Sequence, residues 1–86
     1  MLIVKDFFAE RCGPCMMMKP IVEKLIEKNG DVTFEFVDVD EDSKSTTKYG
    51  IRSIPSFVLE KDGVVVEKKI GVLSEKNFQK LIDKYK

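Results

Sequence analysis

Two cysteines, Cys12 and Cys15, are the residues of this sequence whose type and spacing best suit chemistry. They flank Gly13 and Pro14, at the point where an apolar run gives way to a helical pattern. At a helix N-terminus, unpaired backbone N–H groups and the positive end of the helix dipole favour a thiolate. We therefore expect Cys12 to attack a disulfide, and Cys15, one turn away, to resolve the mixed disulfide that forms.

The cysteine pair allows two other interpretations. A purely structural disulfide would close a very short loop, for which chain entropy accounts for only about 2 kcal/mol of stabilisation. A structural zinc site needs four ligands, and the pair supplies two in a chain that has no histidine and no second cysteine pair. Only a dimeric site or added carboxylates would complete such a site, so we predict no metal site.

The composition of the 86 residues excludes several classes of function. Fifteen basic and fifteen acidic residues give a formal net charge of zero, so we expect neither a nucleic-acid nor a membrane partner. Without histidine, the usual general base and Cys-His activation are absent. No apolar run approaches the roughly 20 residues of a membrane span, and no signal peptide is evident. We expect one domain over residues 1–86, and a cytoplasmic location.

Hydrophobic periodicity predicts seven elements in the order strand, helix, strand, helix, strand, strand, helix. The expected strands are residues 2–8, 32–39, 56–59 and 64–70, and the expected helices run from 14 to 29, from 42 to 49 and from 74 to 85. An Asp62-Gly63 pair between the last two strands favours a tight hairpin. This order predicts an α/β fold: a four-stranded mixed sheet with helices on both faces.

Residues 7–15 (Phe-Phe-Ala-Glu-Arg-Cys-Gly-Pro-Cys) resemble the active-site segment of the thioredoxin family. Further along the chain, Pro20 matches the proline that bends the family's active-site helix, and residues 48–56 resemble its cis-proline segment. The resemblance extends over all 86 residues and implies a minimal thioredoxin fold of glutaredoxin size, without the first strand and helix of an ordinary member. Strand 32–39 should then form an edge of the sheet.

The resemblance also implies roles for residues outside the cysteine pair. Pro55 should follow a cis peptide bond and leave the backbone of Ile54 free to pair with an extended substrate; without the resemblance, Pro55 would be interpreted as a proline that opens a strand. Asp6 should be a partly buried carboxylate with an elevated pKa that takes the proton of Cys15; on periodicity alone, an exposed residue on an edge strand is the alternative.

Three positions depart from the family pattern. Arg11 replaces the tryptophan that usually precedes the first cysteine, Met16 replaces a frequent lysine, and Phe36 stands where a buried lysine often neighbours the aspartate. We expect Met16 to be exposed beside Cys15, and Met17 to belong to the core. The expected substrate-binding residues around the dithiol are Arg11, Gly13, Pro14, Ile54 and Pro55.

The sequence therefore predicts a thiol-disulfide oxidoreductase that reduces protein disulfides, needs no cofactor beyond its own Cys12–Cys15 disulfide, and acts as a monomer. Its expected partners are disulfide-bearing proteins and a thioredoxin-reductase-type or dedicated reductase. One alternative is a glutaredoxin-like enzyme that uses glutathione. Gly13-Pro14 in place of an aromatic pair, and the lack of a Gly-Gly pair after the hairpin, argue against it. The other alternative is a dimeric metal-binding module.

Overall fold

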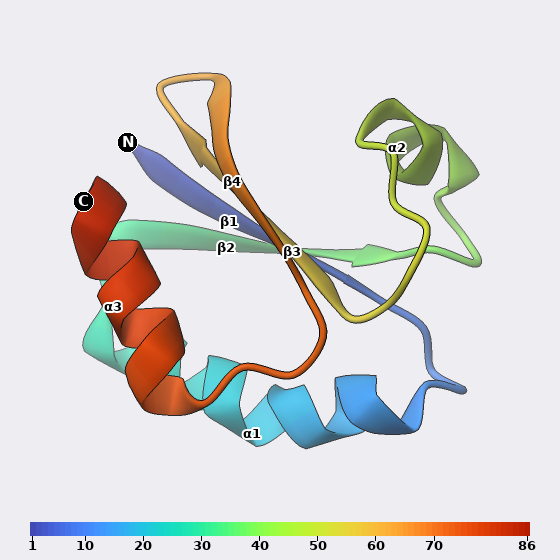
Figure 1. The fold of residues 1–86 in the computed structure, drawn as a ribbon, viewed down its shortest axis with the longest axis horizontal. Helices are drawn as coiled ribbons and strands as arrows, with labels where there is room; N and C mark the ends of the chain where they lie inside the picture. Colours follow the sequence, from blue (N-terminus) through green and yellow to red (C-terminus); the bar gives the residue numbers. More distant parts are fainter.

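A computed structural model describes all 86 residues, which form four strands and three helices (Figure 1). The strands are β1 (Leu2–Phe8), β2 (Val32–Asp38), β3 (Ser56–Lys61) and β4 (Val64–Ile70), and the helices are α1 (Gly13–Lys28), α2 (Ser43–Lys48) and α3 (Glu75–Tyr85). The predicted order of elements is confirmed, with boundaries that differ by a few residues at most. None of the helices is both long enough and apolar enough to span a membrane.

The four strands form one mixed sheet in the order β2-β1-β3-β4. β1 and β2 are parallel and are joined by α1, whereas β3 pairs antiparallel with both β1 and β4. The sheet therefore has β2 at one edge, as predicted, and holds β1 in its interior. This central place of β1 matters for the site, because β1 carries Asp6 and leads directly to the cysteines.

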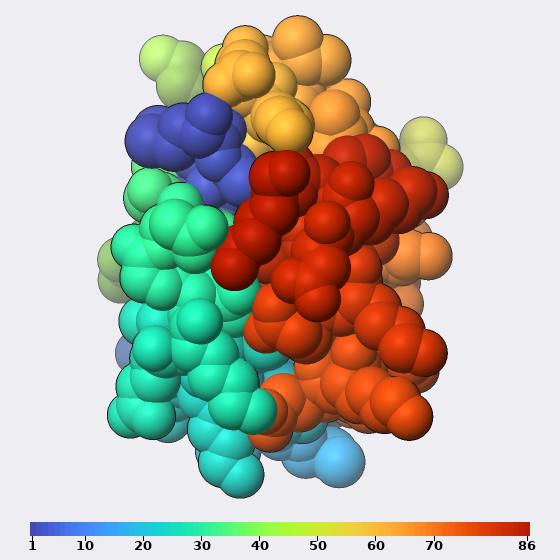
Figure 2. All heavy atoms as spheres, turned by 90° about the vertical axis from the view of Figure 1, so that its left-hand side faces the viewer, coloured from blue at the N-terminus to red at the C-terminus, as the bar shows by residue number.

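Helices α1 and α3 cover one face of the sheet, and α2 lies on the other side (Figure 1). In Figure 2, α3 lies beside the C-terminal end of α1. Between these helices and the sheet, Phe57 and Phe78 pack edge to face with their ring centroids 4.9 Å apart. The core consists of ten buried residues: Leu2, Val4, Met18, Val22, Leu25, Val32, Phe57, Leu59, Phe78 and Ile82.

Local signals fix both ends of α1. Cys12 caps its N-terminus, a proline occupies its first turn, and the C-cap residue Asn29 donates its backbone N–H to the carbonyl of Leu25. The prediction for Met17 is wrong, because its side chain is 63% exposed while Met18 is buried. Only one stripe of the helix faces the sheet, and Met17 lies outside it.

A charged cluster covers part of the opposite face of the sheet, and the sequence pattern did not reveal it. Lys5 Nζ lies 2.6 Å from a Glu35 carboxylate oxygen and 3.9 Å from Glu60, whose carboxylate accepts a hydrogen bond from the Tyr49 hydroxyl. Burial of Glu60 is tolerated because these donors satisfy its charge. The cluster ties α2 to the sheet, since Tyr49 is the C-cap residue of that helix.

Candidate active site

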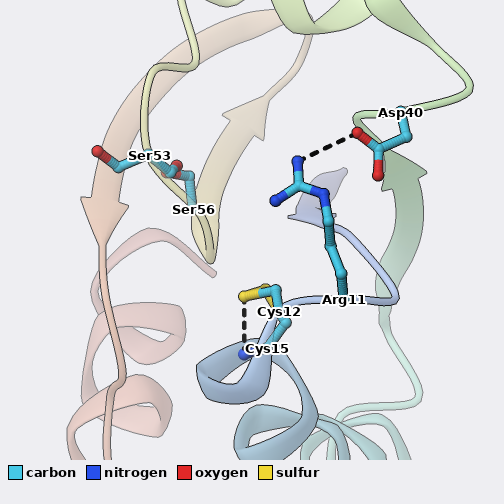
Figure 3. Close-up of a disulfide and its surroundings, with 6 residues drawn as sticks. All are labelled: Arg11, Cys12, Cys15, Asp40, Ser53 and Ser56. Carbon is cyan, nitrogen blue, oxygen red and sulfur yellow. Dashed lines mark hydrogen bonds and ion pairs between the residues drawn. A yellow bond between two sulfur atoms is a disulfide. The ribbon is translucent and has the colours of Figure 1, made fainter.

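The two cysteines lie where β1 gives way to α1. β1 ends at Phe8, and a short loop leads to Cys12, the residue before the first turn of α1. The Cα atoms of Cys12 and Cys15 are 5.2 Å apart, and the two sulfur atoms form a disulfide (Figure 3). This separation is typical of disulfides, so the first helical turn holds both sulfurs at bonding distance without any other support.

The surroundings of the two sulfurs differ. Cys15 lies inside the first turn of α1 and is only 6% exposed, whereas Cys12 is half-buried at the helix end. The Cys12 sulfur accepts the backbone N–H of Cys15 at 3.2 Å, the position of an N-cap acceptor. After reduction, this N–H and the positive end of the helix dipole favour a thiolate on Cys12. Cys12 is therefore the sulfur that accepts the helix N–H and is the more exposed of the two.

Asp6 lies on β1, on the face of the sheet that α1 covers. Its residue is 7% exposed, and its carboxylate takes part in no hydrogen bond or ion pair with the protein. Burial alone raises the pKa of Asp6 from 3.8 to about 6, because nothing nearby stabilises the ionised form. The interpretation of Asp6 as an exposed edge residue is thus wrong. A carboxylate with this pKa can accept a proton near neutral pH.

The Ile54–Pro55 peptide bond is cis, as the resemblance implied. The backbone on both sides is fixed, since the Ser56 hydroxyl donates to the Ser53 carbonyl and the Gly71 N–H donates to the Pro55 carbonyl at 2.8 Å. Ile54, by contrast, makes no backbone hydrogen bond of its own. Figure 3 shows the segment with Ser53 and Ser56 across from the disulfide, so an unpaired stretch of backbone borders the dithiol.

Arg11 extends from the loop before Cys12 toward the segment after β2. Its guanidinium donates to an Asp40 carboxylate oxygen at 3.2 Å, and both side chains are mostly exposed (Figure 3). Arg11, Arg52 and Ile54 also line a shared groove of about 400 Å³. The sequence analysis assigned neither Asp40 nor Arg52 to the site, because no local pattern connects residue 11 with residue 40 or residue 52.

Two of the predicted segments meet at the disulfide: Arg11 precedes Cys12, and the cis-proline segment lies across from it (Figure 3). Asp6 lies on the strand that leads to the cysteines. The donor set does not suit a metal, because no group of three or more cysteine, aspartate or glutamate side chains converges in the fold.

Comparisons with known proteins agree with this geometry. The family model described as Thioredoxin matches residues 1–84. Thioredoxin from Bacillus subtilis is 39% identical over 85 residues, which cover 98% of this chain and 82% of that protein. Thioredoxin from Chlamydia trachomatis is 40% identical over 84 residues, with the same coverage of both chains. The chain belongs to the thioredoxin family.

Solved thioredoxin structures show the same fold. A mutant thioredoxin from Halobacterium salinarum superposes with a TM-score of 0.93 at 39% identity, covering 98% of this chain and 74% of that one. Fasciola hepatica thioredoxin superposes with a TM-score of 0.93 at 40% identity, and the superposition covers 99% of this chain and 81% of the Fasciola chain. The minimal thioredoxin fold is thereby confirmed. Family membership, together with the Cys12–Cys15 disulfide, makes this thioredoxin-like chain a protein disulfide oxidoreductase.

Proposed function

We propose that the reduced protein transfers two electrons from its dithiol to disulfides in other proteins. The Cys12 thiolate attacks one sulfur of the substrate disulfide, which breaks that bond, forms a mixed disulfide and releases the first substrate thiolate. The Cys15 thiol then loses its proton and attacks the Cys12 sulfur. This second step releases the other substrate thiolate and leaves the Cys12–Cys15 disulfide.

The observation that carries this assignment is the different placement of the two sulfurs. Cys12 is half-buried and accepts the Cys15 N–H, so a substrate can reach the sulfur whose thiolate is stabilised. Cys15 is 6% exposed, which keeps it from external disulfides while it remains one helical turn from the mixed disulfide. This asymmetry supports attack by Cys12 and resolution by Cys15.

Asp6 is proposed to accept the Cys15 proton during the resolving attack. The raised pKa of about 6 makes the carboxylate a stronger base than an ordinary aspartate, yet leaves it mostly ionised near pH 7. Asp6 and Met16, the residue after Cys15, line the same groove. The role is assigned to Asp6 because it lies on β1, which leads to the cysteines, and because Cys15 is buried in the first turn of α1.

An extended substrate segment is proposed to dock against Ile54, whose backbone N–H and carbonyl are free to pair with it. Gly13, Pro14 and Pro55 are proposed to line the approach of the substrate to Cys12. Arg11 adds a positive charge to the rim of the dithiol. We propose that this charge selects partners that present an acidic or apolar patch, including a dedicated reductase that recharges the protein.

The proposed cycle uses no cofactor, because the electrons are stored in the two sulfurs themselves. A single chain carries every group that the cycle needs, so the protein is proposed to act as a monomer. It is proposed to act in the cytoplasm, because the reducing direction of the reaction requires a reductase in the same compartment.

The test is substrate trapping with single cysteine variants. Cys15→Ser should accumulate a mixed disulfide between Cys12 and a model protein disulfide, detectable by mass spectrometry, whereas Cys12→Ser should form none and should abolish turnover. Met17→Ser, an exposed position on the same helix, is the matched control and should keep wild-type turnover. Trapping through Cys15 would reverse the assigned roles.

A second arm compares electron donors. Turnover driven by a thioredoxin-type reductase should exceed turnover driven by glutathione with glutathione reductase. Faster turnover with glutathione would support the glutaredoxin-like alternative instead.

A further inference from the structure

A groove of about 380 Å³ opens between α1 and the edge strand of the sheet. We refer to it as the α1–β2 groove. Asp6 and Phe36, which pair in register on β1 and β2, contribute its sheet side, and Met16 and Ile26 contribute the apolar part of its α1 side. Lys19 and Glu23, also on α1, are the other charged residues that line it.

The apolar walls of the α1–β2 groove are open to solvent. Phe36 is 54% exposed, Met16 42% and Ile26 38%, although periodicity places Ile26 on the apolar side of α1. These residues lie at the edge of the sheet, where β2 has no strand on its outer side. Exposed apolar surface gathered in a concave site is typical of ligand binding.

Asp6 gives this groove a specific chemistry. The residue is only 7% exposed, and no donor or cation of the protein is bound to its carboxylate. Lys19 is the only basic residue that lines the groove, and it forms no ion pair with Asp6. A buried carboxylate without a partner is unfavourable when ionised, which is why burial raises its pKa to about 6. A bound cation would remove this penalty.

We propose that the α1–β2 groove binds a small organic cation, with its apolar body between Phe36 and the α1 wall and its ammonium group on the Asp6 carboxylate. The volume lies within the range of small-molecule sites. The charges of the lining favour a cation: Asp6 and Glu23 outnumber Lys19, and an anionic ligand would place like charge beside Asp6. A neutral apolar ligand would fill the groove and leave Asp6 without a partner.

The test uses the oxidised full-length protein and phenethylamine as the probe. The chain has four methionines, so labelled methyl groups give NMR signals inside and outside the groove. Phenethylammonium should shift the Met16 methyl signal saturably and leave the exposed Met1 and Met17 signals in place. Benzyl alcohol should bind at least tenfold more weakly, and phenylacetate more weakly still. Equal binding of the alcohol, or no saturable shift at Met16, overturns the proposal.

Three variants separate the charge from the cavity. Asp6→Asn removes the charge at nearly constant volume and should lower the affinity for phenethylamine at least tenfold, to that of the alcohol. Phe36→Lys, at a half-exposed position, places an ammonium group of its own in the groove and should abolish binding. Glu27→Gln, an acidic residue of α1 outside the groove, should leave the affinity unchanged within twofold. Undiminished binding to Asp6→Asn overturns the proposal whether or not the protein is active.

Discussion

Replacing Asp6 by asparagine should stabilise the oxidised protein at pH 8 and have little effect at pH 4. The pKa of Asp6 is about 6 in the folded protein against an ordinary value of 3.8, so the folded state holds this proton more tightly than the unfolded chain does. Raising the pH through this window therefore ionises the group in the unfolded state first and lowers the free energy of unfolding. A pKa difference of about 2 corresponds to about 3 kcal/mol, because each pKa unit is worth about 1.4 kcal/mol.

The effect of Asp6→Asn on the free energy of unfolding is best measured as a difference between two pH values. Asparagine also changes packing and hydrogen bonding around position 6, but this part does not depend on pH and cancels. At pH 8 the full cost of ionising the buried Asp6 destabilises the folded protein, whereas at pH 4 most of this cost has disappeared. The stabilisation by Asp6→Asn should therefore be larger at pH 8 by about 2 to 3 kcal/mol. Urea unfolding followed by far-UV circular dichroism suits this chain, which has no tryptophan to report by fluorescence.

Glu27→Gln is the control for the pH change, because Glu27 is exposed and its substitution should shift stability by less than about 0.5 kcal/mol at either pH. An Asp6→Asn effect that is the same at both pH values within about 0.5 kcal/mol would refute the argument. So would an effect of opposite sign, in which wild type gains stability relative to the variant as the pH rises, since it would mean that Asp6 has an ionic partner in the folded state.

Other regions of the molecule give further expectations. Asn29→Ala should lower the free energy of unfolding by about 2 to 3 kcal/mol, because the buried amide donates to the Leu25 carbonyl at 2.8 Å and exchanges hydrogen bonds with Gln79; a loss below about 0.5 kcal/mol in urea unfolding would show that this contact is not structural. Ser74→Ala removes the N-cap acceptor of α3 and should lower stability by about 1 kcal/mol, as read from the same unfolding curves, with Ser74→Gly less harmful. Arg11→Trp loses an exposed ion pair and should change stability by less than about 1 kcal/mol. In steady-state kinetics, Arg11→Trp should raise the apparent affinity for a standard thioredoxin reductase without changing turnover at saturation. Equally efficient turnover of wild type and Arg11→Trp by that reductase would show that Arg11 does not govern partner choice.

The local part of this structure could be predicted from the sequence because its causes are local. The spacing of Cys12 and Cys15 fits one helical turn, Pro14 suits the start of a helix, and Asp62-Gly63 forms a hairpin turn with positive φ at both residues. Each of these depends on a few neighbouring residues. The order of elements, and with it the place of the dithiol at a strand-to-helix junction, follows from such signals.

Asp6 shows where local reasoning stops. The apolar run of β1, interrupted only at Lys5 and Asp6, does not show what lies beside the strand, so the sequence pattern left Asp6 either exposed or buried. Its burial depends on pairing with β2 on one side and with β3, some fifty residues further on, on the other. The raised pKa follows from this nonlocal pairing and from the helix that packs above it.

Which residues share a face of an element could be worked out from the chain alone, but what covers that face depends on how the elements pack. Helical spacing places Ile26 on the side of α1 that carries the core residues, yet it is 38% exposed, because it faces the edge strand β2, beyond which the sheet does not continue. Arg11 and Asp40 meet for the same kind of reason, since the parallel pairing of β1 and β2 brings the segments after them together. Periodicity is a property of one element, but burial, pKa and charge pairing depend on the elements that pack against it.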